Sequence, residues 1–139
     1  MQMDRFTTLA QEVLSNAQSL STGRSHAELT PLHLLASMLE DRNGVASSIL
    51  AKAGLQPERV RDVAEAELAR QPQASGTQPR TANATMEVLQ RAEREAKDRK
   101  DAYVSTEHLL LALMEGPSAA REVLSSCGAQ RPHIDAAID

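Results

Sequence analysis

The sequence of 139 residues contains one cysteine, one phenylalanine, one tyrosine and no tryptophan. The single cysteine, Cys127, excludes an internal disulfide and fits a reducing compartment. No apolar run approaches the roughly 18 to 20 residues that a membrane-spanning helix needs, and the N-terminus lacks the layout of a signal peptide. We therefore expect a soluble, cytoplasmic protein with no membrane partner.

Patterns typical of enzymes, metal sites and nucleic-acid-binding proteins are also missing. No glycine precedes a lysine, which excludes the phosphate-binding G-x-x-x-x-G-K-S/T loop of P-loop ATPases. The net charge is -4, and no stripe of Lys and Arg is interleaved with aromatic residues, which disfavours nucleic acid as a partner. Cys127 has no identifiable activating base, and His33 and His108 lack metal-site spacing. We predict no enzyme activity and no metal or cofactor in this chain.

What the sequence does contain is a repeated pattern. Residues 103–115 read Y-V-S-T-E-H-L-L-L-A-L-M-E, and residues 29–40 read L-T-P-L-H-L-L-A-S-M-L-E. When these segments are aligned, Thr30 falls on Ser105, and beyond Glu40 the register shortens by one position, so that Gly54 falls on Gly128. The chain is therefore an internal duplication in which one copy has lost a loop residue.

The duplicated segments predict two buried helices. Thr30 and Ser105 are N-cap residues, because their hydroxyl oxygens can accept from unpaired amides of the first turn. Glu107 places negative charge at the positive end of its helix. His33 and His108 stand three residues after the caps, where a side chain can bond back to the cap, so we expect structural roles for both. The unbroken apolar runs place these helices at the centre of the fold, near a pseudo-twofold axis.

Helical periodicity of the apolar residues predicts six further helices. They cover about residues 4–22, 45–53, 57–68, 86–101, 123–128 and 131–138. The result is an all-α fold of eight helices in two pseudo-symmetric four-helix repeats, about residues 4–70 and 81–138, packed as one domain. Residues 71–80 are rich in Pro, Gly, Ser and Gln and form the predicted linker. The mixed charges of residues 91–101 predict a solvated helix face with i,i+4 pairs.

Four motifs resemble one known family. They are the opening D-R-F-T-T-x-A-Q-E-V-L, the segments L-T-P-L-H-L-L-A-S-M-L-E and G-V-A-S-S-I-L-x-K-A-G of the first copy, and K-D-A-Y-V-S-T-E-H-L-L-L-A-L of the second. Together they closely resemble the Clp N-terminal (Clp repeat) domain, and within it the ClpB/Hsp104 disaggregase branch. The resemblance covers essentially the whole chain, and the family fold of two pseudo-symmetric repeats agrees with the duplication.

The resemblance implies a chaperone function. Such a domain sits flexibly on a hexameric, ATP-driven AAA+ ring of the same protein and binds unfolded or aggregated polypeptides before they are threaded. An Hsp70-type co-chaperone acts with the full protein. ATP and Mg belong to ATPase modules that this sequence does not contain, so the resemblance implies no cofactor in this domain.

The resemblance also implies site residues. A threonine of the first segment and an acidic pair around the second repeat's helix start take part in substrate handling, which falls on Thr7, Asp101 and Glu107. A groove lined by apolar residues lies between the halves, and we place Leu89 and Tyr103 near it. For Thr7 the alternative is a cap of the first helix, and for the acidic pair it is compensation of the helix dipole.

The ClpC branch of the same family is the alternative. Its members carry T-E-H in both copies, and the two acidic residues recognise phosphorylated arginine. This chain has Thr106-Glu107-His108 in the second copy but Pro31-Leu32-His33 in the first. Because Leu32 cannot bind a guanidinium group, we favour the disaggregase branch, with an adaptor-docking or phosphoarginine-recognising domain of an ATP-dependent protease as the alternative.

Overall fold

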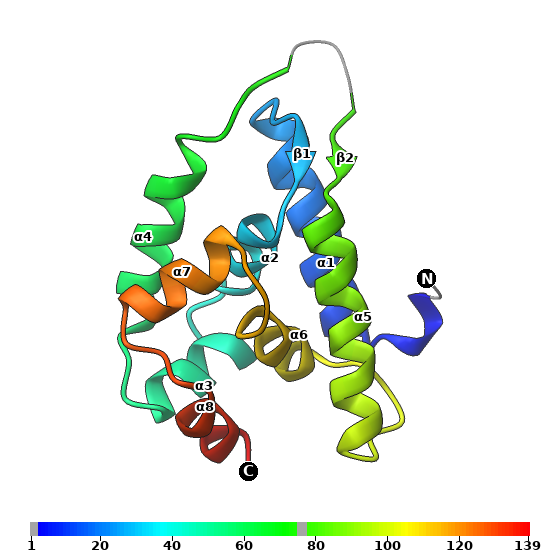
Figure 1. Ribbon diagram of the computed structural model, residues 1–139, viewed down its shortest axis with the longest axis vertical. Helices are drawn as coiled ribbons and strands as arrows, with labels where there is room; N and C mark the ends of the chain where they lie inside the picture. The colour runs from blue at the N-terminus through cyan, green and yellow to red at the C-terminus, as the bar shows by residue number, and fades with distance from the viewer. Residues whose placement is uncertain (1–2, 75–77) are drawn as a thin grey trace.

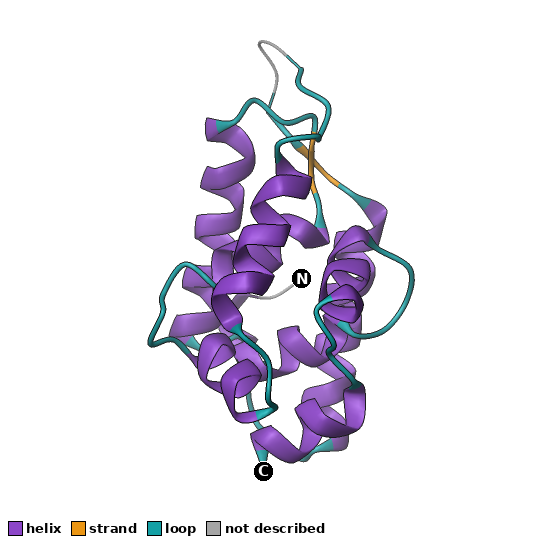
Figure 2. Ribbon diagram, turned by 90° about the vertical axis from the view of Figure 1, so that its left-hand side faces the viewer, coloured by secondary structure: helices purple, strands orange, loops and turns teal. Residues whose placement is uncertain are grey.

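The computed structural model describes residues 3–74 and 78–139, and helices dominate them (Figures 1 and 2). The eight α-helices of this part of the chain confirm the predicted all-α fold. They are α1 (Thr8–Gly23), α2 (Pro31–Met38), α3 (Val45–Lys52), α4 (Pro57–Leu68), α5 (Asn83–Asp98), α6 (Thr106–Leu113), α7 (Ala119–Ser126) and α8 (Arg131–Ile138). A short 3-10 helix, η1 (Met3–Arg5), precedes α1, and β1 (Glu28–Leu29) pairs with β2 (Arg80–Thr81).

The backbone repeats itself in the register seen in the sequence. The alignment of the two copies places the starts of α1 and α2 on those of α5 and α6. After the change of register by one position, it places the starts of α3 and α4 on those of α7 and α8. Even rare backbone conformations recur, since Ser25 and Lys100 have φ angles of 56° and 61°. Gly54 and Gly128, with φ angles of 92° and 97°, follow α3 and α7 in the left-handed conformation that closes a helix. The two pseudo-symmetric four-helix repeats are confirmed.

Helices α2 and α6 form the centre of the core. All eight residues of α2 are buried, as are all residues of α6 except Glu107. Both N-termini carry a capping box. The Thr30 N–H donates to His33 Nδ1 at 2.9 Å, and the Ser105 N–H donates to His108 Nδ1 at 2.8 Å. The structural roles expected for the two histidines are thereby confirmed.

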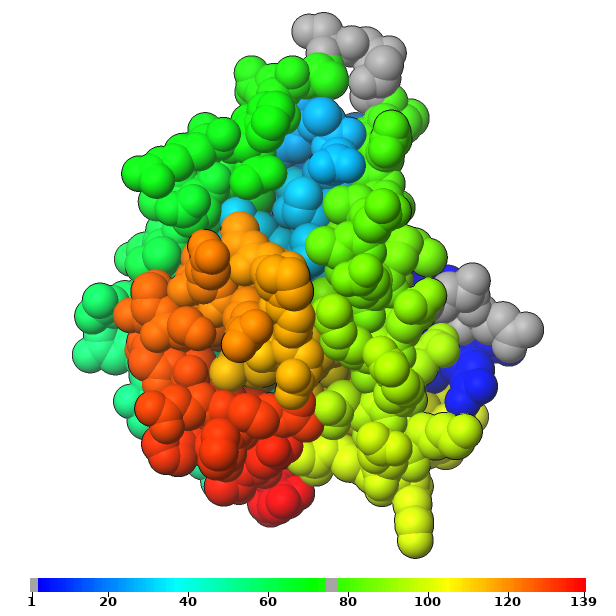
Figure 3. Space-filling model, viewed as in Figure 1, coloured from blue at the N-terminus to red at the C-terminus, as the bar shows by residue number. Residues whose placement is uncertain are grey.

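The two repeats exchange short backbone pairings. Strand β1 precedes α2 and pairs in parallel with β2, which precedes α5. In the same way Val104, before α6, forms a parallel bridge with Phe6, before α1. Figure 2 shows the β1–β2 pair at one end of the helical body. Helix α4 of the first repeat also packs against α7 of the second, on the face shown in Figure 3.

The mixed-charge end of α5 is less solvated than the sequence predicts. One i,i+4 pair is present, with 3.4 Å between Arg91 Nη2 and the Glu87 carboxylate. Glu95 and Arg99, however, form ion pairs with Arg131 and Asp135 of α8, each at 2.7 Å. This part of α5 is therefore an interface between helices, because its charged side chains find partners that are distant in sequence.

The predicted linker, residues 71–80, lies only partly within the described chain, because residues 75–77 fall outside it. The described part is bonded to the first repeat. The Ala27 N–H donates to the Pro72 carbonyl at 3.1 Å, and the Ala74 N–H donates to the Ser25 carbonyl at 2.8 Å. The domain boundaries remain a prediction. In the described residues, no helix combines the length and the apolar character required to cross a membrane.

Candidate functional site

The bridge between Phe6 and Val104 brings the first helix to the start of α6. The Thr7 N–H donates to the Val104 carbonyl at 2.9 Å. Thr7 Oγ1 accepts from the Ala10 N–H at 3.1 Å and so caps α1, which explains why the helix begins at Thr8 and not at Asp4. Thr7 thus has the capping role considered as an alternative, and it lies beside the segment that carries Tyr103 and Glu107.

Replacing Thr7 tests this structural role. Thr7→Ala removes the oxygen that accepts from the Ala10 N–H, and we expect it to lower the free energy of unfolding by about 1 kcal/mol. Thr7→Ser keeps the hydroxyl group and is the matched control, with a loss of less than about half of that. Urea unfolding measures both. Equal losses in the two variants would contradict the capping role.

Asp101 is bound to the capping histidine of the second repeat. Its carboxylate lies 2.7 Å from Nε2 of His108. Because Nδ1 of His108 accepts from the Ser105 N–H, Nε2 carries the hydrogen that is donated to Asp101. The Asp101 side chain remains 50% exposed, whereas Glu107 forms no ion pair with any described residue. Two carboxylates therefore flank the start of α6, and the Asp101 carboxylate also orients a buried ring.

The first repeat has a histidine where the second has Asp101. The alignment of the two copies places His26 on Asp101, and His26 Nδ1 lies 2.7 Å from Nε2 of His33. Burial, followed by the nearby His26, lowers the pKa of His33 to about 4. Burial, followed by Arg24, also lowers the pKa of His26. Near neutral pH this histidine pair is uncharged. The second repeat, in contrast, has the Asp101 carboxylate at this position.

A groove of about 490 Å³ lies between α1, the connection from α2 to α3, and the first residue of α6. Its lining combines apolar side chains, three carboxylates and small polar groups. The lining residues are Leu9, Glu12, Val13, Asn16, Ser37, Met38, Glu40, Asp41, Asn43, Gly44, Val45 and Thr106. Leu9 is 57% exposed, so the groove has an accessible apolar side chain at its edge.

The groove differs from the one expected near Leu89 and Tyr103. Leu89 is 9% exposed and belongs to the core, and Tyr103 is 57% exposed next to Val104. Neither residue lines the groove. The apolar pattern of α5 predicts that Leu89 is buried, but it does not tell which neighbouring helix covers it. A substrate-binding role for these two residues stays a prediction.

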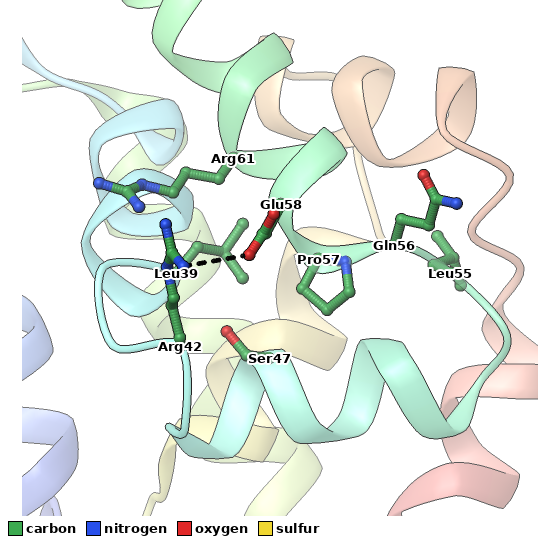
Figure 4. A pocket seen from close by; sticks show the side chains of 8 residues that line it. All are labelled: Leu39, Arg42, Ser47, Leu55, Gln56, Pro57, Glu58 and Arg61. Atoms are coloured by element: carbon green, nitrogen blue, oxygen red, sulfur yellow. Dashed lines mark ion pairs between the residues drawn. The ribbon is translucent and has the colours of Figure 1, made fainter.

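A second hollow, of about 430 Å³, lies between the end of α2, α3 and the start of α4 (Figure 4). Its polar lining includes two arginines, Arg42 and Arg61, whose guanidinium groups lie on the same side, and one carboxylate, Glu58. Arg42 lies 3.5 Å from Glu58, but both side chains are at least 70% exposed. Such an exposed pair adds little stability. In the described residues no group of three or more His, Cys, Asp or Glu side chains is arranged to hold a metal ion.

The duplicated arrangement of four plus four helices, with a central capped helix in each half, defines the class as an all-α tandem-repeat domain. The model of the Clp repeat (R) N-terminal domain family matches residues 5–127. The chain therefore belongs to this family, and the resemblance noted in the sequence is confirmed.

Individual relatives agree with this assignment. The chain is 37% identical over 131 residues to the chaperone protein ClpB of Mycobacterium leprae, covering 91% of this chain and 15% of that protein. The Hsp104 N-terminal domain of Candida albicans has the same fold, with a TM-score of 0.84 at 23% identity over 95% of this chain and 87% of that one. A ClpV N-domain solved in complex with a VipB peptide gives a TM-score of 0.77 at 21% identity, covering 95% of this chain and 83% of that one. The chain spans about 15% of the length of its ClpB relatives.

Proposed function

We propose that this chain is the substrate-binding N-terminal domain of a ClpB-type disaggregase and engages unfolded or aggregated polypeptide. The observation that carries the proposal is the groove beside Leu9, where an exposed apolar side chain stands next to carboxylates. An apolar surface with an acidic rim complements unfolded segments that combine apolar and basic residues. Two comparisons support this function. The chain is 37% identical in sequence to a ClpB chaperone, and a ClpV N-domain of similar fold was solved in complex with a peptide.

Binding by this domain is weak and reversible. A disordered client loses conformational freedom when it binds, and this entropy offsets part of the interaction free energy. Low affinity suits a domain that passes its client on to another part of the protein. The domain then delivers its client to the hexameric AAA+ ring of the full-length chaperone. The ring uses ATP and Mg, and the chaperone acts with an Hsp70-type co-chaperone in the cytoplasm. This domain binds neither ATP nor Mg.

The ClpC-type alternative, recognition of phosphoarginine, has less support from the first repeat. Leu32 occupies the position that Glu107 occupies in the second repeat, and it is 1% exposed. A buried leucine provides neither charge nor a hydrogen-bond acceptor for a guanidinium group. The first repeat therefore presents no carboxylate there, and docking of a folded adaptor is the other remaining candidate.

Charge removal at the start of α6 tests the proposed function. The double variant Asp101→Asn, Glu107→Gln keeps an acceptor for His108 Nε2–H but removes two negative charges. We expect it to bind a reduced and alkylated, permanently unfolded protein about threefold to tenfold more weakly, because one or two exposed charge interactions are lost. Glu122→Gln, in the first turn of α7, is the matched control and leaves the affinity unchanged.

A two-dimensional NMR titration of the domain measures this affinity and separates the alternatives. Shifts near Thr7, Leu9 and Glu107 with the unfolded protein, and none with free phosphoarginine, are the expected result. Shifts with phosphoarginine at the starts of α2 and α6 would instead indicate the ClpC type. An absence of shifts with both would refute substrate binding by this domain.

A further inference from the structure

In the second repeat an arginine occupies part of the corresponding groove, where a hollow of about 220 Å³ remains beside Ala84 and Ser118. The Arg91 side chain, which is 21% exposed, extends from α5 to the end of α6. Its Nη1 donates to the Glu115 carbonyl at 3.2 Å, and its Nη2 lies 3.4 Å from the Glu87 carboxylate. The guanidinium lies so close to Gly116 that a Cβ at this position would displace it. The chain itself thus shows how this type of groove holds an arginine.

The acceptors of Arg91 have counterparts in the first repeat. The alignment of the two copies places Glu12 on Glu87 and Glu40 on Glu115. The same alignment places Asn16 on Arg91. Asparagine is too short to reach the end of α2, which leaves the groove of about 490 Å³ open in the first repeat and lined by these three residues.

Among the described residues, no cation is paired with the counterparts of these acceptors in the first repeat. Neither Glu12 nor Glu40 forms an ion pair with a described residue, and both are exposed. Within the described chain, no group donates a hydrogen bond to the Glu40 carbonyl oxygen. Asp41 adds a third carboxylate to the same wall. The C-terminal end of α2 adds the partial negative charge of a helix C-terminus.

We propose that the groove of the first repeat binds an arginine side chain of an unfolded polypeptide, with its guanidinium placed as that of Arg91 is in the second repeat. The Glu12 carboxylate and the Glu40 carbonyl accept its hydrogen bonds, and Leu9 and Val13 contact its aliphatic part. A planar guanidinium reaches two acceptors at once, whereas the compact ammonium of lysine does so less well. This proposal rests on the proposed function, because it assigns the client residue that the groove selects.

A matched pair of peptides tests the selection. Each is an unstructured Gly/Ser peptide with one leucine and, next to it, either arginine or its uncharged analogue citrulline. In NMR titrations we expect the arginine peptide to shift the amides of Glu12, Asn16 and Glu40 and to bind about fivefold to tenfold more tightly, as charge-assisted hydrogen bonds predict. Equal affinities would overturn the arginine site and leave the proposed function standing if the unfolded protein still binds. If that protein also fails to bind, both are overturned.

Exchanging the residues of the two repeats gives a second test. Asn16→Arg supplies the first groove with an internal arginine, and we expect the preference for the arginine peptide to disappear, whereas Asn16→Gln keeps it. Arg91→Asn empties the second groove and is expected to produce a second set of shifts around Glu87 and Glu115. Glu12→Gln removes the charge but keeps the size of the side chain, and it is expected to reduce the preference for the arginine peptide. A preference that survives in both Asn16→Arg and Glu12→Gln, with normal melting curves, would overturn the proposal.

Discussion

Lowering the pH from 7 to 5 is expected to cost the folded domain about 2 kcal/mol through His33 alone. Burial, followed by the nearby His26, lowers the pKa of this ring to about 4, and its side chain is fully buried. In the unfolded chain the pKa of His33 is near 6.5. Between these values the unfolded chain binds a proton that the folded chain does not. The free energy of unfolding therefore decreases as the pH is lowered. The loss grows to about 3 kcal/mol near pH 4.

Urea unfolding at several pH values between 7 and 5 measures this effect, because most carboxylates stay ionised in that range. His26 acts in the same direction, since burial and Arg24 lower its pKa as well. The informative variant is His26→Asp, which gives the first repeat the carboxylate that Asp101 provides in the second. A carboxylate next to Nε2 stabilises the protonated ring, so the loss between pH 7 and 5 is expected to shrink. A wild-type stability that is constant over this range would contradict the buried, neutral pair.

Shortening a buried side chain of the central helix α6 is expected to lower the free energy of unfolding by a similar amount. Leu110 is fully buried, in a helix that contacts α1, α2, α3, α5 and α8. Leu110→Ala removes buried methyl groups and leaves a cavity in the core, which costs about 3 kcal/mol. Leu35, its counterpart in α2, is also fully buried, so Leu35→Ala is expected to cost a similar amount. A loss below about 1 kcal/mol in either variant would contradict the central position of these helices.

Leu9→Ala is the matched control for the core variants. The Leu9 side chain is 57% exposed, so its removal is expected to change the free energy of unfolding by less than about 0.5 kcal/mol. The same variant should weaken binding of the unfolded protein, because Leu9 lines the groove. Urea unfolding and the NMR titration together therefore separate residues that support the fold from residues that contact the client.

The two repeats share a backbone but differ in the residues that matter for binding. At aligned positions the first repeat has His26, Leu32 and Asn16, and the second repeat has Asp101, Glu107 and Arg91. As a result the carboxylates at the helix start belong to the second repeat, while the larger groove belongs to the first. The Phe6–Val104 bridge and the contact of Thr106 with the groove join these features in one region. The duplication supplies the fold, and its asymmetry supplies the candidate site.

Local features of the sequence were sufficient to determine the helices and the duplication. The caps at Thr30 and Ser105, the unbroken apolar runs and the glycines after α3 and α7 act within one or two helical turns. Their consequences can therefore be predicted without knowledge of the tertiary structure. The capping role of Thr7 and the position of Glu107 in a first turn follow from the same short-range rules.

Only the tertiary structure decided which of these residues meet. The exchange of pairings between the repeats, the contact of His26 with His33 and the ion pairs between α5 and α8 join residues that a spacing pattern does not connect. The sequence aligns Asn16 with Arg91, but it does not show that the arginine side chain lies against Gly116 and narrows one groove while the other stays wider. Side-chain direction and packing between helices determine that difference, and both depend on the complete fold.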